Sequence, residues 1–234
     1  IYKAENQNWD ISQANNKFIY AANNKGLLEF NGSDWQLYPT PNKTIMRSVK
    51  VVKDKIYTGF YMDFGFWKKN KFGELKFTSI VKEQNIQMLE DEQIWTILES
   101  DGWVLFRSLE RIYLYNLETK EVKVISPSNK LLKLSKVNDV IYFQEIGQGV
   151  FEIENGVPHG QGTFYIPNGV HSKTHPYNNS KFVGTYKNGD RDEGTFTWKN
   201  GNTFTGSYKD NKKWNGEKYY KEDNETIRFE NGED

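Results

Sequence analysis

Short apolar runs separated by polar turns recur along the first two-thirds of the chain. From Ile1 to about Ile153, runs of β-branched and aromatic residues alternate with Gly, Asn, Asp and Pro. Runs of this length, bounded by turn-forming residues, are typical of successive β-hairpins. No long amphipathic helical pattern interrupts them, so the sequence predicts an all-β fold.

Four of these runs align on a shared core, at residues 18–21, 55–58, 103–106 and 140–143. Equivalent positions within them are Ile19, Ile56, Val104 and Ile141, which follow one another at intervals of 37, 48 and 37 residues. This spacing is close to that of a four-stranded propeller blade. A second apolar run ending in a turn follows each core, as expected if each blade buries one face against the next. We therefore predict partial propeller-like blades, about four in number, over residues 1–155.

A longer series of motifs in the same segment resembles that of a known protein family. The motif NWDISQ at residues 8–13 is followed by GLL at 26–28, Trp35, RS at 47–48 and IYTG at 56–59. In this spacing the chain resembles the extracytoplasmic propellers of two-component regulators from Bacteroidetes-type bacteria. The resemblance implies a sensor in the periplasm whose loops and central face receive a ligand such as a glycan fragment, and whose signal passes to protein partners. It also implies rings of about seven blades, so about four blades leave the last blade face to be covered by something else.

The final third of the chain follows a different pattern. Five residues recur 22 positions later: Phe182, Gly184, Tyr186, Gly194 and Trp198 reappear as Phe204, Gly206, Tyr208, Gly216 and Tyr220. Residues 160–169 match residues 194–201 as an earlier copy of the same pattern. This pattern resembles MORN repeats, which implies a ribbon of stacked β-hairpins over residues 156–234. The extra residues 170–180 are predicted to form a protruding loop.

Composition narrows the function classes. Lys+Arg 31 balances Asp+Glu 31, so no nucleic-acid partner is expected, and direct membrane binding would need a local basic patch. Cysteine is absent, which excludes disulfides and thiolate metal sites. The chain has no apolar run long enough to span a bilayer, and because it starts at Ile1 rather than Met we expect that its N-terminus was trimmed.

Three segments carry residues that could do chemistry, and each has a simpler interpretation. His171 and His175 have a metal-ligand spacing, but Pro176 disfavours the helix that this spacing needs. Residues 188–194 are rich in oxygen ligands but place Glu193 where a calcium loop needs glycine. Residues 90–92 form an acidic run whose neighbouring side chains should point apart, as in a charged loop. We therefore predict no catalytic residue, metal or cofactor.

Aromatic rows in the final third are the candidate binding residues. Most of these rings should be core, and an exposed subset, with neighbouring lysines, should contact a protein partner or, less readily, anionic head groups. The candidates are Phe182, Tyr186, Trp198, Phe204, Tyr208, Trp214 and Tyr220, with Lys187, Lys199, Lys209, Lys212 and Lys213. The predicted function is a non-enzymatic ligand-sensing or protein-recognition module. The alternatives are a structural scaffold or membrane-surface tether driven by the hairpin ribbon, and a carbohydrate-active enzyme.

Overall fold

A computed structural model of the chain describes residues 4–127, 129–146, 149–154, 157–166, 180–187, 190–210 and 212–232. These residues form antiparallel β-strands and a single helical turn, which confirms the predicted all-β class. The chain divides into two compact units, Ile1–Ser126 and Pro127–Asp234. Each unit is described here by itself.

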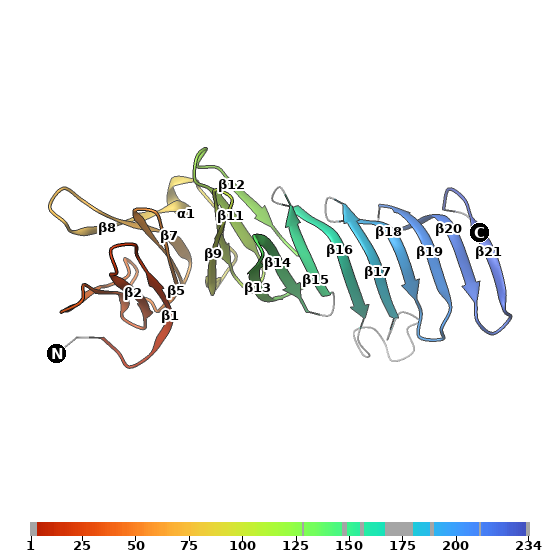
Figure 1. Ribbon diagram of the computed structural model, residues 1–234, viewed down its shortest axis with the longest axis horizontal. Helices are drawn as coiled ribbons and strands as arrows, with labels where there is room; N and C mark the ends of the chain where they lie inside the picture. Colours follow the sequence, from red (N-terminus) through yellow and green to blue (C-terminus); the bar gives the residue numbers. More distant parts are fainter. Residues whose placement is uncertain are drawn as a thin grey trace. The chain divides into compact units, whose positions relative to one another are not determined.

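The first unit contains three four-stranded sheets, in each of which the strands pair in chain order (Figure 1). The first sheet comprises β1 (Asn8–Gln13), β2 (Ile19–Asn23), β3 (Gly26–Phe30) and β4 (Trp35–Tyr38). The second comprises β5 (Met46–Val52), β6 (Lys55–Phe60), β7 (Asp63–Lys69) and β8 (Leu75–Ser79). The third comprises β9 (Thr96–Ser100), β10 (Trp103–Arg107), β11 (Ile112–Asn116) and β12 (Val122–Ile125). The predicted core runs at 18–21, 55–58 and 103–106 supply the second strand of each sheet, so the first three predicted blades are confirmed.

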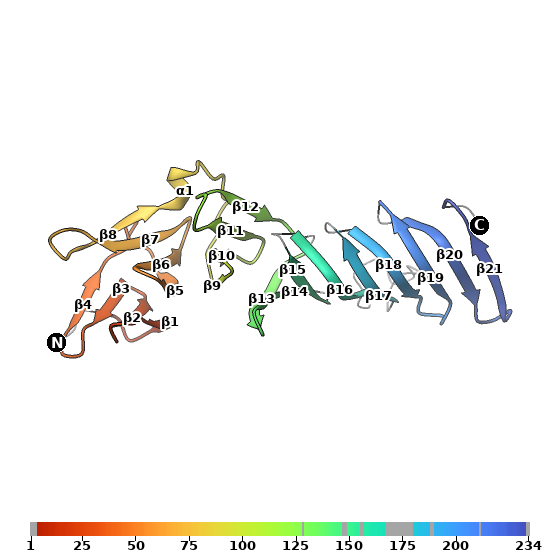
Figure 2. The ribbon, with the colours of Figure 1, turned by 45° about the horizontal axis from the view of Figure 1, so that its top comes forward.

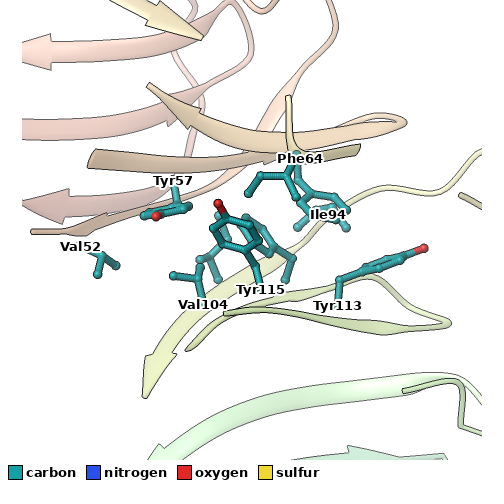
Figure 3. Close-up of a cluster of buried hydrophobic side chains, with 10 residues drawn as sticks. Val52, Tyr57, Phe64, Ile94, Val104, Tyr113 and Tyr115 are labelled. Atoms are coloured by element: carbon teal, nitrogen blue, oxygen red, sulfur yellow. The ribbon is translucent and has the colours of Figure 1, made fainter. Parts of the chain in front are cut away.

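The three sheets are propeller-like because their first strands lie side by side, with β5 between β1 and β9. A core of buried residues joins the first sheet to the second, with Tyr20 and Leu27 packed against Met46 and Phe60. A second core joins the second sheet to the third (Figure 3), where Tyr57 and Phe64 from one sheet face Val104, Tyr113 and Tyr115 from the other. Aromatic rings are half of the buried residues of this second core and a third of those of the first, where aliphatic side chains are the majority.

The interval of 48 residues between Ile56 and Val104 has a structural explanation. After β8 the chain makes one helical turn, α1 (Ile80–Glu83), which begins where the Ser79 side chain accepts a hydrogen bond from the Lys82 amide. The loop that follows brings Ile94 into the core between the second and third sheets, where Ile80 is also buried. The additional residues of this repeat therefore contribute Ile80 and Ile94 to the core, while most of the residues between them are exposed.

The second unit is a nine-stranded antiparallel sheet whose strands follow chain order (Figure 2). Its first strands are β13 (Leu131–Val137), β14 (Val140–Glu145) and β15 (Gly149–Glu154). The hairpin ribbon, our name for the remaining strands, comprises β16 (Val157–Ile166), β17 (Ser180–Lys187), β18 (Asp190–Thr197), β19 (Thr203–Lys209), β20 (Lys212–Tyr220) and β21 (Glu225–Phe229). Ser180 opens β17, and the rest of the loop predicted at 170–180 lies outside the described residues.

Two sequence predictions differ from this structure. The run at 140–143 lies in β14 and belongs to the nine-stranded sheet, so it does not form a separate fourth blade. The boundary between compact units lies after Ser126, whereas the sequence placed it near Gly156. The reason is that β15 pairs with β16, with Ile153 opposite Pro158, so one sheet continues across the change in repeat pattern. Three residue pairs, residues 152–154 opposite residues 157–159, join the two strands, so β15 is not an edge at which the sheet ends.

The 22-residue repeat is reproduced in strand register. Phe182 faces Phe196 and Gly184 faces Gly194, and 22 residues later Phe204 faces Lys218 and Gly206 faces Gly216. A Cβ on Gly184 would lie 2.5 Å from Phe182 Cζ, and one on Gly216 would lie 3.0 Å from Phe204 Cζ. The rings therefore lie over the facing glycines and occupy the space that side chains would take, which explains why both phenylalanines are fully buried.

Candidate ligand-binding site

An irregularity recurs in the innermost strand of each propeller-like sheet. The pairing of β1 with β2 skips Trp9, and the pairing of β5 with β6 skips Arg47. In the third sheet the amide of Trp95, just before β9, donates to the Arg107 carbonyl that also faces Thr96. Such bulges leave one residue outside the ladder and turn its side chain out of the regular alternation. They bring together Trp9, Arg47 and Trp95, which we call the inner-strand cluster.

The second unit has register shifts as well, and one of them lies in the strand pair that continues the propeller-like pattern. The pairing of β13 with β14 skips Leu132, whose side chain is 54% exposed. The bulge is therefore a property of the repeated strand pair, and the residue that fills it varies among Trp, Arg and Leu.

The Arg47 guanidinium lies in the corner between the two indole rings. Its Cζ is 3.9 Å from the centroid of the Trp9 ring and 4.7 Å from that of Trp95, and the two rings meet edge to face at 6.2 Å. Cation–π contacts of this kind each contribute about 0.5–1 kcal/mol where solvent reaches them, and about 2 kcal/mol where it does not. Burial lowers the pKa of Arg47 below its usual value.

Hydrogen bonds fix the members of this cluster. Trp9 Nε1 donates to Asn24 Oδ1 at 2.7 Å, and Arg47 Nε donates to Gln93 Oε1 at 3.2 Å. Next to them, the Ser48 hydroxyl donates to the Ile94 carbonyl at 3.2 Å. Gly59 permits this approach, because a Cβ there would lie 2.4 Å from Ile94 Cγ2.

Alternate residues of β1 tie the first sheet to the second. Asp10 Oδ2 accepts a hydrogen bond from the Val49 amide and Ser12 Oγ accepts one from the Val51 amide, each at 3.0 Å. Burial raises the pKa of the Asp10 carboxyl, while its backbone donors act in the opposite direction. The motif NWDISQ thus combines a bulge residue with two acceptors that hold the adjacent innermost strand.

A pocket of about 520 Å³, which we call the inner-strand pocket, opens beside the cluster. Its lining residues are Glu5, Asn24, Lys25, Lys43, Thr44, Ile45, Arg47, Tyr61 and Gln93. Three of these side chains are cationic, and Glu5, the one carboxylate among the lining residues that the structure describes, is paired with Lys25 at 2.9 Å. The pocket is therefore polar, aromatic at its border and electropositive.

The acidic run at 90–92 does not form a pair of acids. The exposed Asp91 accepts a hydrogen bond from the Tyr61 hydroxyl at 2.5 Å. Glu92 is buried, contrary to the solvated loop expected from sequence, and its Oε2 accepts from the Tyr113 hydroxyl at 2.6 Å and from the Leu89 amide at 2.9 Å. Burial raises the pKa of Tyr113, and its hydrogen bond to Glu92 raises it further. These carboxylates have separate structural partners and do not converge on one space.

The other chemical candidates fall partly outside the described structure. His171, His175 and the turn residues at 188–189 lie outside the described residues, and Asp190 opens β18. Within the described part of the chain, no group of three or more His, Cys, Asp or Glu residues is placed to hold a metal ion.

The aromatic candidates of the hairpin ribbon separate into two groups. Phe182, Tyr186, Phe204 and Tyr208 are buried, and their rings contact one another edge to face at 5.2–5.6 Å. Trp198, Trp214 and Tyr220 are partly exposed. A lysine ammonium group lies over each of these three rings. The Nζ atom of Lys213 is 4.9 Å from the Trp198 ring centroid, that of Lys209 is 4.4 Å from the Trp214 centroid, and that of Lys218 is 4.5 Å from the Tyr220 centroid. The second group is the part of the predicted site that solvent can reach.

Sequence reasoning did not identify the inner-strand cluster, although a signal was present. Arg47, Trp95 and Leu132 each stand nine positions before the aligned core residues Ile56, Val104 and Ile141. A bulky side chain at a fixed distance before each core marks a structurally equivalent position.

Comparisons with known proteins bear on the fold. No family model and no curated protein matches the chain. Over 97% of its length the chain aligns with the extracellular domain of the hybrid two-component system BT4673 from B. thetaiotaomicron, at 14% identity and a TM-score of 0.51, and it spans 33% of that domain. It also aligns over 97% of its length with 84% of the WD40 β-propeller domain of Doa1, at 10% identity and a TM-score of 0.51. At these identities the similarity shows the fold alone.

These findings support the resemblance to Bacteroidetes sensor propellers as a likeness of fold. The resemblance to MORN repeats is not shown by any comparison and stays a prediction. The only helix in the described part of the chain is the single turn α1, so none there is long and apolar enough to cross a membrane.

Proposed function

We propose that this chain is a non-enzymatic recognition module of an extracytoplasmic sensor, and that it binds a small glycan-type ligand in the inner-strand pocket. The observation that carries the proposal is the convergence of Trp9, Arg47 and Trp95, each from a different propeller-like sheet, beside a polar pocket. Repeated bulges that direct three side chains to one place are typical of a built site. The likeness to extracellular sensor domains supports the same class of function.

The residues of the pocket favour binding over hydrolysis. Glycoside hydrolysis uses two carboxyl groups about 5–10 Å apart. Among the described residues that line the pocket, Glu5 is the one carboxylate, and its partner Lys25 holds it in an ion pair. Hydrogen-bonding amides, hydroxyls and ammonium groups beside an aromatic border are instead what a sugar-binding pocket requires.

The ligand is tested by thermal shift and calorimetry with a panel of sugars: cellobiose, xylobiose, a chondroitin disaccharide and N-acetylglucosamine 6-sulfate. At about 10 mM sugar, which detects millimolar dissociation constants, at least one should raise the melting temperature. Trp9→Ala should weaken that binding about tenfold or more, because it removes the contact with Arg47 and the bond to Asn24.

Trp35→Ala is the matched control, because Trp35 is 41% exposed, as Trp9 is 39% exposed, but its ring stacks on Phe30 at 4.8 Å, whereas the Trp9 ring contacts Arg47. Equal binding by wild type and Trp9→Ala, or no response to any sugar of the panel, contradicts the proposal. Release of reducing ends from a disaccharide would show that the protein is an enzyme.

The hairpin ribbon supports a second role, in contact with a protein partner. Trp198, Trp214 and Tyr220 each combine a partly exposed ring with a lysine ammonium, which suits a partner with acidic and aromatic side chains. The scaffold hypothesis rests on the same three pairs, and a membrane tether would use them for anionic head groups.

Vesicle sedimentation separates the two kinds of partner. The protein should sediment equally poorly with pure phosphatidylcholine vesicles and with vesicles that contain phosphatidylglycerol. Selective sedimentation with the anionic vesicles, lost on changing Lys209, Lys213 and Lys218 to glutamine, would identify the ribbon as a membrane tether and contradict the protein-partner proposal.

A further inference from the structure

The Arg47 side chain has hydrogen-bonding capacity that the protein does not use. Arginine carries five N–H donors in a planar fork. Nε donates to Gln93, but neither terminal nitrogen bonds to any residue that the structure describes, and Nη1 is buried without a partner. A buried polar group without a partner is costly, and such groups are retained where another molecule completes them.

The charges around Arg47 leave the inner-strand pocket electropositive. Lys25, Lys43 and Arg47 line it, and the single lining carboxylate, Glu5, already pairs with Lys25. The whole chain carries equal numbers of acidic and basic residues, so this excess is local. An anionic group that enters the pocket would meet an unpaired guanidinium edge and a lysine.

Arg47 is also held in position before any ligand arrives. Two indole rings and the bond to Gln93 restrict its rotamers, and Trp9 is itself fixed by Asn24. Little side-chain entropy is then lost when an anion binds. The terminal nitrogens of the guanidinium carry the N–H donors that remain, and carboxylate and sulfate oxygens are acceptors that such charged donors bind strongly.

We propose that the inner-strand pocket recognises a sugar that carries a carboxylate or sulfate group, and that Arg47 is the residue that binds this anionic group. The inference rests on the proposed function, which it narrows from glycans in general to acidic ones. Carboxylate and sulfate share the chemistry that Arg47 would recognise, and the sugar ring would lie against the polar side of the pocket, near Thr44 and Tyr61.

The experiment is calorimetry of the full chain with three probes: glucuronate, N-acetylglucosamine 6-sulfate and neutral glucose. The wild type should bind at least one acidic sugar about tenfold more tightly than glucose. Arg47→Met, which keeps the length of the side chain, should weaken acidic-sugar binding about 10–100-fold, the loss expected for charge-assisted hydrogen bonds. Arg47→Lys keeps the charge but not the planar fork of donors, so its affinity for the acidic sugar should lie between those of the wild type and Arg47→Met. Arg228→Met is the control, because Arg228 is exposed in the hairpin ribbon and pairs with Glu230.

Salt and free ions provide readouts that do not depend on the variants folding normally. Raising NaCl from about 50 to about 500 mM should weaken acidic-sugar binding by the wild type, because the interaction is ionic. Acetate and sulfate ions alone should bind more weakly than the corresponding sugars, and equal binding would mean an ion site without sugar recognition, which overturns the inference.

The remaining outcomes separate the two proposals. Equal affinity for glucose and the acidic sugars, unchanged in Arg47→Met, overturns the inference and leaves the proposed function standing. A glutamate dipeptide serves as a further probe, and if it binds while no sugar does, the ligand is an acidic peptide and both proposals are overturned. No binding of any probe overturns both as well.

Discussion

Replacing Phe64 by alanine should destabilise the first unit by about 3–5 kcal/mol, the cost of removing a large buried aromatic side chain. The Phe64 ring is fully buried and lies 4.5 Å from the Phe106 ring and 5.0 Å from the Tyr113 ring, centroid to centroid. The second and third sheets meet through these rings, so the cavity would lie between two sheets and could not close by moving one side chain. Because domains of this size are stable by about 5–15 kcal/mol, the loss is a large share of the total.

The control for this change is Phe72→Ala, since Phe72 is 76% exposed in the turn between β7 and β8. Urea denaturation gives the size of the effect, and hydrogen exchange shows where it acts. Amides of β5–β12 should exchange faster in Phe64→Ala. If Phe64→Ala and Phe72→Ala unfold at the same urea concentration, the core between the second and third sheets is not as described.

Replacing Gly206 by alanine should destabilise the hairpin ribbon by about 3 kcal/mol, near the upper end of the range for overpacking. The new Cβ would lie 2.1 Å from the Asn215 carbonyl oxygen and 2.6 Å from Gly216 Cα, so the strands β19 and β20 would have to separate. Separation would also lift the Phe204 ring from the position it occupies over Gly216.

Thr205→Ala is the matched control, because Thr205 is adjacent in sequence, lies on the opposite face and is exposed. It loses only a hydroxyl contact with Thr195, and we expect a change below about 1 kcal/mol. Hydrogen exchange in Gly206→Ala should accelerate in β17–β21 and leave β1–β12 unchanged. A Gly206→Ala protein with the stability of Thr205→Ala would mean that the facing glycines are not in close contact.

The repeated units could be predicted from sequence because their signals are local. Ile19, Ile56 and Val104 lie in runs bounded by turn residues, and each run became the second strand of a sheet. The 22-residue repeat likewise fixed the register of β17–β20, down to the facing glycines. Alternation along a strand and turn chemistry at its ends decide both results.

Whether the fourth apolar run forms a separate blade depends on how the strands that follow it pair. Residues 140–143 have the same pattern as the three blades, but whether β15 is followed by an outer strand or by a longer sheet depends on β16, which comes after the change in repeat pattern. The hydrophobic pattern of a strand predicts which of its faces is buried, but it does not predict which strand will pair with its edge. The predicted boundary near Gly156 was misplaced for the same reason.

The candidate site was only partly accessible to sequence analysis. Trp198, Trp214 and Tyr220 were recognised as aromatic candidates, but the sequence alone did not separate them from the buried Phe182 and Phe204. Trp9 and Arg47 were noticed as part of a family resemblance, and their contact depends on bulges in two different sheets. A bulge inserts one residue and interrupts the alternation along the strand, and in strands as short as these the interruption resembles the end of the strand.

The facing glycines of the ribbon give each 22-residue unit a fixed size. One unit supplies two strands, and strands in a sheet are about 4.8 Å apart, so duplicating or deleting a unit would change the length of the ribbon by roughly 10 Å while leaving every ring over its own glycine pair. The distance that the ribbon spans would therefore change in equal steps with the number of units.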